Sequence, residues 1–212
     1  DWSSDVCSSD LVKNTVKLFK NATRPVLLVG NGVRLSGAVS IFHKLVNKIN
    51  VPVLTSRRGA DIVSNNHKLY FGRPGAYGQR AANFIIQNSD LLLCIGARLS
   101  IPQIGRSYKY FARNAKKIIV DIDALELKKK TVRADIAINQ DAKKFIEALL
   151  DEKIDERLWE KFENMSFALN DSWPRILDYD GTSESITKDE SDKDFKSLVD
   201  HLKELRERDD GN

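Results

Sequence analysis

The sequence predicts an α/β protein: a doubly wound, mostly parallel, six-stranded Rossmann-like sheet with helices on both faces, followed by a helical tail. Apolar strands alternate with amphipathic helices over roughly the first 150 residues, which favours a parallel sheet. The strands at 25–30 and 91–96 are continuously apolar, as is typical of strands covered on both faces. We therefore predict the strand order 3-2-1-4-5-6, with the switch point between the first and fourth strands.

Each element follows from the local pattern of apolar and turn-forming residues. The first helix, 12–20, carries Val12, Val16, Leu18 and Phe19 on its apolar side. The predicted strands are 25–30, 51–55, 69–71 (short, at the sheet edge), 91–96, 117–121 and 134–138. The predicted helices between and after them are 36–49, 81–87, 105–111 and 141–150.

The character of the chain changes after residue 150. Residues 151–170 are charged and amphipathic, and Trp173-Pro174 ends that segment. Residues 181–194 are polar and read as a linker, whereas 195–205 have the spacing of an amphipathic helix. We predict a main domain at 12–150, a helix and polar linker at 151–194, and a separate tail segment at 195–212 that contains the amphipathic helix.

The first eleven residues resemble the in-frame translation of a sequencing-library adapter. They lack the basic start and apolar core of a signal peptide. We therefore assign residues 1–11 as a non-native segment. We also expect the chain to be a fragment of a longer protein.

The composition excludes several function classes. No apolar run in the 212 residues reaches the length of a membrane span. Two cysteines, Cys7 and Cys94, cannot form a disulfide framework, which favours a reducing, cytoplasmic location. The net charge is +4, but the lysines lie in short dispersed clusters without interleaved aromatic residues, so nucleic-acid binding is not expected.

Glycine corners follow the two strongest strands and predict a nucleotide or dinucleotide site. Gly30-Asn31-Gly32 and Gly96-Ala97-Arg98 both fall at the predicted switch point, and a third glycine-rich loop holds Gly72, Gly75 and Gly78. Glycine lets backbone amides approach a ligand closely. The alternative is an ordinary glycine turn, because the spacing to Gly37 departs from the dinucleotide fingerprint.

Charged residues at the strand ends have two interpretations. Asp121 and Asp123 can accept hydrogen bonds from ribose hydroxyls, or they can cap the short helix that follows, and Asp141 has the same ambiguity. Arg73 and Arg98 can pair with phosphates or form surface ion pairs, and beside glycine corners we favour phosphate. No acidic residue closes the second strand, where Thr55-Ser56-Arg57-Arg58 stand, which argues against an ordinary NAD-binding domain.

Candidate catalytic residues are few. His43, His67 and His201 have no evident triad partner, and Cys94 lies within a strand and reads as an inert core thiol. No histidine or cysteine cluster has metal-ligand spacing. We predict no catalytic residue and no metal ligand in this chain.

Several motifs in collinear order resemble the central domain of thiamine-diphosphate-dependent enzymes, and acetolactate synthases in particular. The resemblance covers roughly 12–150. Its motifs are Arg24-Pro-Val-Leu-Leu-Val-Gly-Asn-Gly-Val33, Val51-Pro-Val-Leu-Thr-Ser56, Gly72-Arg-Pro-Gly-Ala-Tyr-Gly78, Gly96-Ala-Arg-Leu99 and Ile119-Val-Asp-Ile-Asp123.

The resemblance implies a three-domain enzyme that decarboxylates or condenses 2-oxo acids with thiamine diphosphate and Mg²⁺. It places their motifs in the two other domains of the same polypeptide, which would be this domain's partners, and it implies a homo-oligomer, a dimer or tetramer, for the whole enzyme. It also implies that 195–212 is the truncated start of the C-terminal, pyrophosphate-binding domain. For this domain it implies FAD or ADP. The residues it implies for that binding are Gly30, Asn31, Gly32, Thr55, Gly75, Tyr77, Gly78, Gly96, Ala97, Arg98, Asp121, Asp123 and Asp141.

One departure from the family pattern keeps alternatives open. Flavin-binding members carry a Phe-Asp-Asp-Arg type of run after Gly-Ala-Arg, whereas this chain has Leu99-Ser-Ile-Pro102. The first alternative is a structural spacer or oligomerisation domain without a nucleotide. The second and weaker alternative is an NAD-binding domain.

Overall fold

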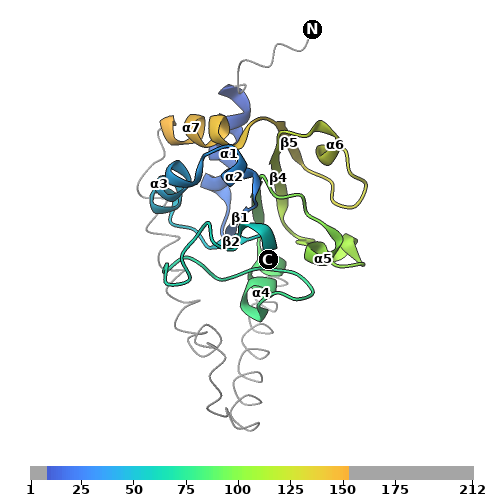
Figure 1. The fold of residues 1–212 in the computed structure, drawn as a ribbon. Helices are drawn as coiled ribbons and strands as arrows, with labels where there is room; N and C mark the ends of the chain where they lie inside the picture. The colour runs from blue at the N-terminus through green and yellow to red at the C-terminus, as the bar shows by residue number, and fades with distance from the viewer. Residues whose placement is uncertain (1–8, 153–212) are drawn as a thin grey trace, which may run out of the picture. The chain divides into compact units, whose positions relative to one another are not determined.

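The computed structural model describes residues 9–152, which form one five-stranded parallel sheet flanked by helices (Figure 1). The strand order is β2-β1-β3-β4-β5. The strands are β1 (Pro25–Val29), β2 (Val53–Thr55), β3 (Leu91–Ile95), β4 (Lys116–Asp121) and β5 (Ile136–Asn139). The helices are α1 (Ser9–Asn21), α2 (Gly32–Leu35), α3 (Val39–Ile49), α4 (Arg80–Asn88), α5 (Ile101–Ile104), α6 (Ala124–Leu127) and α7 (Ala142–Asp151), with 3-10 turns at Arg57–Gly59 and Tyr108–Tyr110.

The continuously apolar strands divide their side chains between two cores. In β1, Leu27 and Val29 belong to the core under α1, α3 and α7, whereas Val26 and Leu28 belong to the core under α4. Figure 1 shows α1, α3 and α7 gathered on one side of the sheet. Since successive strand side chains point to opposite faces, the apolar run is explained by helices on both faces, as predicted.

The direction in which successive strands are added to the parallel sheet reverses between β1 and β3. The chain passes from β1 to β2 on one side and then returns to β3 on the other, where Pro25 pairs with Leu91 and Val29 with Ile95. The predicted switch point is therefore confirmed, because β1 and β3 are the first and fourth of the predicted strands.

The prediction of six strands in the order 3-2-1-4-5-6 is not confirmed. Residues 69–71 form no strand, and their only pairing is one isolated parallel bridge between Tyr70 and Val53. The segment lies beside β2, where the prediction placed it. A turn precedes it and Gly72, with a φ of 94°, bends the chain directly after it, so too few residues stay extended to make a strand.

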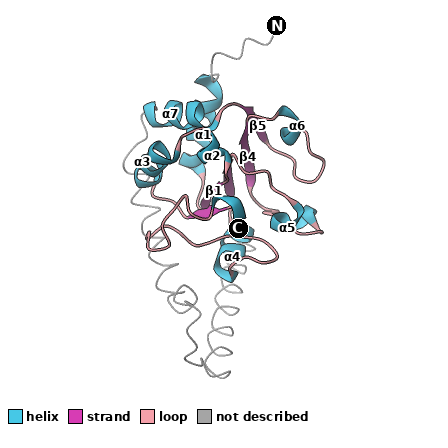
Figure 2. Cartoon of the chain, viewed as in Figure 1, coloured by secondary structure: helices cyan, strands magenta, loops and turns pink. Residues whose placement is uncertain are grey.

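Two helix predictions also differ from the structure. A helix at 105–111 is wrong: α5 ends before Gly105, whose φ is 81°, and only a 3-10 turn follows. The predicted helix at 36–49 begins later, at Val39 (α3), because Gly37, whose φ is 69°, separates it from the short helix α2, which lies before the predicted segment. In Figure 2 the long loops on either side of α4 and α5 are drawn in pink.

Three of the predicted segments fall wholly or mainly outside the described residues. Helix α1 begins at Ser9 and partly buries Leu11 against the core. The adapter assignment for 1–11 stays a prediction, as do the linker at 151–194 and the further domain at 195–212, which lie mainly outside 9–152. None of the helices in 9–152 has the length and apolar character of a membrane span.

The amino edge of the sheet is held by Asp90, just before β3. Its carboxylate accepts the backbone N–H of Thr23 at 2.7 Å, the Thr23 hydroxyl at 2.6 Å and the N–H of Arg24 at 2.8 Å. Burial alone would raise the pKa of Asp90, but these hydrogen bonds and the Arg24 charge lower it below its ordinary value. Both oxygens are therefore occupied, and the role of this carboxylate is structural.

Candidate functional site

A crevice of about 1110 Å³ lies at the opposite, carboxyl edge of the sheet. The segments that follow all five strands contribute to its lining, together with the loops around Gly75 and Pro102. Ligands of doubly wound proteins bind outside the carboxyl ends of the strands at the switch point. The crevice is thus where the topology leads one to expect a site.

Most of the residues implied for nucleotide binding line this crevice: Asn31, Gly32, Gly75, Tyr77, Gly78, Gly96, Arg98, Asp121, Asp123 and Asp141. The other three, Gly30, Thr55 and Ala97, are not part of the lining. Thr55 is fully buried and its hydroxyl is 2.9 Å from that of Tyr70, while Ala97 packs in the core on the α4 side.

The glycine corners after β1 and β3 pack directly on each other. A Cβ on Gly30 would lie 2.1 Å from the Gly96 carbonyl oxygen, and one on Gly32 would lie 2.6 Å from the Gly96 Cα. The N–H of Gly30 donates to Ile95 O and that of Gly32 to Gly96 O. The packing of two turns therefore accounts for these glycines, and both N–H groups already have protein acceptors.

The third glycine loop is held by side chains of the following helix. Asn83 accepts the N–H of Gly75 at 2.8 Å and donates to its carbonyl at 3.0 Å. Gln79 accepts the N–H of Arg73 at 2.8 Å. Tyr77, at the tip, is 91 % exposed. The loop backbone is thus well fixed, while its tip projects into solvent beside the crevice.

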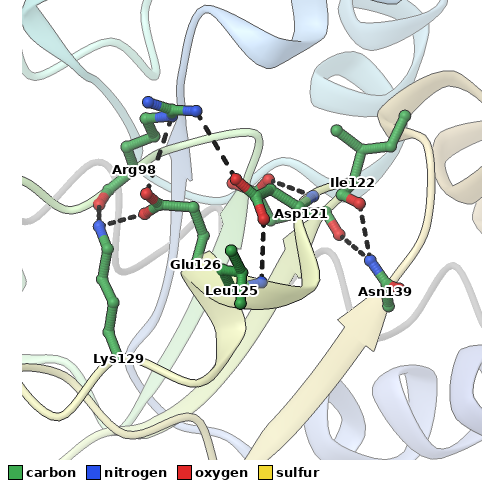
Figure 3. Close-up of polar contacts among 8 residues, drawn as sticks. Arg98, Asp121, Ile122, Leu125, Glu126, Lys129 and Asn139 are labelled. Atoms are coloured by element: carbon green, nitrogen blue, oxygen red, sulfur yellow. Dashed lines mark hydrogen bonds and ion pairs between the residues drawn. The ribbon is translucent and has the colours of Figure 1, made fainter.

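Asp121, at the end of β4, is the buried carboxylate of the crevice. It is 8 % exposed, and its Oδ1 accepts the N–H of Asp123 at 2.9 Å (Figure 3). Burial raises its pKa; Glu126 and Asp123 also raise it, and the N–H of Asp123 and the charge of Arg98 oppose the rise without cancelling it. Among residues 9–152, Oδ2 has no hydrogen-bond donor.

The helix-cap interpretation holds for Asp123 and Asp141. Oδ1 of Asp123 accepts the N–H of Leu125 at 2.9 Å and caps α6. Oδ1 of Asp141 accepts the N–H groups of Lys143 and Lys144 and caps α7. Each cap occupies Oδ1 alone. Oδ2 of Asp123 lies 3.8 Å from the Arg98 guanidinium, which is beyond hydrogen-bonding distance, so Oδ2 of either carboxylate can still accept a hydrogen bond from a ligand.

Asp121 and Asp123 lie on one side of the crevice, which we call the acidic side. Arg98 lies across this side and makes long ion pairs there. Its guanidinium is 3.8 Å from Asp123 and 3.9 Å from Glu126, and its side chain is 72 % exposed (Figure 3). Lys129 contacts both the Arg98 carbonyl and Glu126. The backbone of Arg98 is therefore anchored, whereas its guanidinium makes only contacts beyond hydrogen-bonding distance.

The sequence interpretation missed part of the lining. Ser56, Arg57 and Arg58 line the crevice after β2, and Gln103 and Gln140 line it elsewhere. The sequence did carry a signal for the two arginines, because they follow the carboxyl end of a strand, as Asp123 does. The sequence interpretation treated that position only as the place of a missing acidic residue.

Of the residues considered for catalysis, those within 9–152 lie away from the crevice, and His201 lies outside the described residues. Burial raises the pKa of the Cys94 thiol to about 12, so this cysteine is an inert core residue, as predicted. His43 and His67 contact Ile62 O and Asn47 and are not in the lining. Within 9–152 no three His, Cys, Asp or Glu side chains cluster as metal ligands would.

A family model described as "Thiamine pyrophosphate enzyme, central domain" matches residues 12–149. The chain belongs to this family. The match covers almost the whole of the predicted main domain, 12–150. The resemblance read from the glycine corners and the strand ends is therefore confirmed, and the crevice is that of a thiamine pyrophosphate enzyme central domain.

Three similar curated proteins carry the name acetolactate synthase large subunit, two of them as probable. The chain is 35% identical over 203 residues to a probable acetolactate synthase large subunit of Methanococcus aeolicus, covering 90% of this chain and 33% of the relative. It is 39% identical over 139 residues to the protein of the same name from Methanocaldococcus jannaschii, covering 66% and 23%. It is 35% identical over 147 residues to the acetolactate synthase large subunit of Lactococcus lactis subsp. lactis, covering 69% and 25%. The chain thus spans a third or less of the length of these relatives.

Proposed function

We propose that this chain is the nucleotide-binding central domain of a longer, thiamine-diphosphate-dependent enzyme similar to acetolactate synthase. The observation that carries the proposal is the crevice at the switch point, which combines arginines with carboxylates that keep a spare oxygen. Arginine pairs with phosphate and carboxylate accepts ribose hydroxyls. At about 1110 Å³ the crevice slightly exceeds the roughly 300–1,000 Å³ of common small-molecule sites, which suits a nucleotide or a dinucleotide.

The residues that would hold FAD or ADP fall into two groups. Asp121 and Asp123 would accept ribose hydroxyls with their second oxygens, and the arginines of the lining would face the phosphates. A nucleotide bound here would anchor the ends of the strands, so its contribution is structural. Thiamine diphosphate and Mg²⁺ would supply the decarboxylation and condensation chemistry from outside residues 9–152, which offer no metal cluster.

The rest of the proposal concerns the longer protein. We propose that it acts on 2-oxo acids in a homo-oligomer, with further domains of the same polypeptide as this domain's partners. Its cytoplasmic location stays a prediction from cysteine usage. The names of the relatives support a thiamine-diphosphate-dependent enzyme, and we propose a 2-oxo acid as its substrate.

A structural spacer without a nucleotide is the second candidate. Its support is specific: the Gly30 and Gly32 N–H groups are bonded within the protein, and Leu99, which begins the departure from the flavin-type run, is buried with a φ of 44°. An NAD-binding domain has less support, because Ser56-Arg57-Arg58 follow β2 where an acidic residue would be needed.

The test is a titration of the purified chain with FAD, ADP and NAD, followed by flavin fluorescence and thermal unfolding. A ligand at a hundred times its Kd should stabilise the fold by about 2.7 kcal/mol. Asp121→Asn should abolish most of that stabilisation. Asp135→Asn is the matched control, because Asp135 accepts the Lys117 N–H and is not part of the lining. A folded chain that responds to none of the three ligands would favour the spacer.

A further inference from the structure

Three arginines line the β2 side of the crevice and have no partner among residues 9–152. Arg57 and Arg58 follow β2 directly, and Arg73 follows the bridge residue Tyr70 beside it. Within residues 9–152, none of their guanidinium groups makes a hydrogen bond or an ion pair. Arg98, on the other side, lies between two carboxylates. We call Arg57, Arg58 and Arg73 the arginine wall.

The backbone that carries the arginine wall is fixed by neighbouring side chains. Arg34 donates to Asn31 Oδ1 at 2.9 Å and to the Arg58 carbonyl at 3.3 Å, and it pairs with Asp61 at 2.6 Å. The Arg34 hydrogen bond lowers the pKa of Asp61, so the nearby carboxylate is ionised and already paired. Arg73 is held at its N–H and its carbonyl by Gln79. Three positive charges are thus presented from ordered segments.

The arginine wall and the acidic side of the crevice are separated by the width of the sheet. In the order β2-β1-β3-β4, three strand spacings lie between the end of β2 and Asp121 at the end of β4. Neighbouring strands lie about 4.8 Å apart, so the two sides are about 14 Å apart along the edge. A ligand that uses both sides must be elongated, with hydroxyl groups at one end and negative charge at the other.

We propose that the crevice takes a nucleoside polyphosphate, with its ribose at Asp121 and Asp123 and its terminal phosphates at the arginine wall. The proposal rests on the proposed nucleotide-binding function and specifies the ligand. The acidic side repels phosphate, so only one orientation places unlike charges together. FAD would put an uncharged ring system, rather than an anion, against three guanidinium groups that no residue of 9–152 pairs.

The experiment is calorimetric titration of the full 212-residue chain with adenosine, ADP, ATP and FAD in metal-free buffer. We expect ATP to bind about tenfold more tightly than ADP, because each added phosphate gains charge-assisted hydrogen bonds. Arg58→Gln should weaken ATP about tenfold and leave adenosine unchanged. Arg113→Gln is the matched control, because Arg113 is exposed and is not part of the lining.

The outcomes separate this proposal from the proposed function. Tighter binding of FAD than of ATP, or equal affinities for ADP and ATP, would overturn the polyphosphate proposal while nucleotide binding stands. Inorganic tripolyphosphate serves as a second probe when no nucleotide binds. If tripolyphosphate binds the parent chain and Arg113→Gln but not Arg58→Gln, the arginine wall is supported as an anion site. The proposal that the crevice binds a nucleotide would still be overturned. A chain that binds neither overturns both.

Discussion

The two edges of this sheet use the same residue type in opposite ways. At the amino edge, Asp90 engages both oxygens with three donors, and its pKa is lowered. At the carboxyl edge, Asp121 engages one oxygen, lies among other carboxylates and has a raised pKa. A fully bonded carboxylate stabilises a fold, whereas one that is buried, under-bonded and crowded by like charge costs stability. Such a cost is typical of positions that serve a ligand.

The largest expected effect concerns the glycine corner at the carboxyl edge. Gly30→Ala places a Cβ 2.1 Å from the Gly96 carbonyl oxygen, a backbone atom that cannot move aside alone. We expect a loss of roughly 4 kcal/mol, or no folded protein, since overpacking against backbone is severe. Chemical denaturation measures the free energy of unfolding.

Gly37→Ala is the matched control for Gly30. Gly37 has a φ of 69° but open space around its Cβ position. Only the conformational cost of a left-handed alanine applies there, about 1–2 kcal/mol. Similar losses at both positions would show that the contact between the two turns contributes little. The packing of the two glycine turns would then not explain the stability of the carboxyl edge of the sheet.

The next effect tests the amino edge. Asp90→Asn replaces one acceptor oxygen with an NH₂ group that faces N–H and O–H donors. We expect a loss of about 2 kcal/mol at pH 7. Because the folded pKa of Asp90 is lowered, its contribution is present above the unfolded value of about 3.9 and is lost as pH falls through the folded pKa. Denaturation midpoints of variant and parent should therefore converge in acid.

The third prediction is that removing a carboxylate at the carboxyl edge stabilises the fold, whereas removing Asp90 at the amino edge destabilises it. Asp121→Asn keeps an acceptor for the Asp123 N–H but removes a crowded charge. We expect a gain of about 0.5–1 kcal/mol at pH 7, together with weaker nucleotide binding. The folded pKa is raised, so the gain is full above that pKa and disappears below the unfolded value of about 3.9. A destabilised Asp121→Asn protein would contradict the contrast between the edges.

The smallest effect concerns His67, in the segment that leads from β2 to Arg73. Its Nδ1 accepts the Leu69 N–H at 3.2 Å, and burial, followed by His43 and Lys68, lowers its pKa. Protonation removes that acceptor, so stability should fall by less than about 1 kcal/mol as pH drops below about 6.5. His67→Gln should flatten this decline in a thermal-unfolding pH series. An unchanged pH dependence would show that the segment is held without His67.

The element pattern of the main domain was readable from the sequence. The apolar runs of β1 and β3, the amphipathic periods of α1, α3 and α7, and the caps at Asp123 and Asp141 depend on side chains close in the chain. Two local exceptions come from positive-φ glycines: the predicted edge strand stops at Gly72, and α5 ends before Gly105, where the predicted helix was to begin. Both conformations are permitted by glycine without being required by it.

The sequence by itself determined the alternation of elements, the switch point and most of the residues that line the crevice, because all three follow from local pattern and chain order. Only the tertiary structure decided what those residues do. In the tertiary structure Gly30 and Gly32 pack on Gly96, and Asp121 accepts a hydrogen bond at only one of its two oxygens among residues 9–152. Arg57, Arg58 and Arg73 line the same crevice. Convergence of groups far apart in the chain depends on which strand lies beside which, and hydrophobic periodicity does not encode the pairing of individual polar atoms.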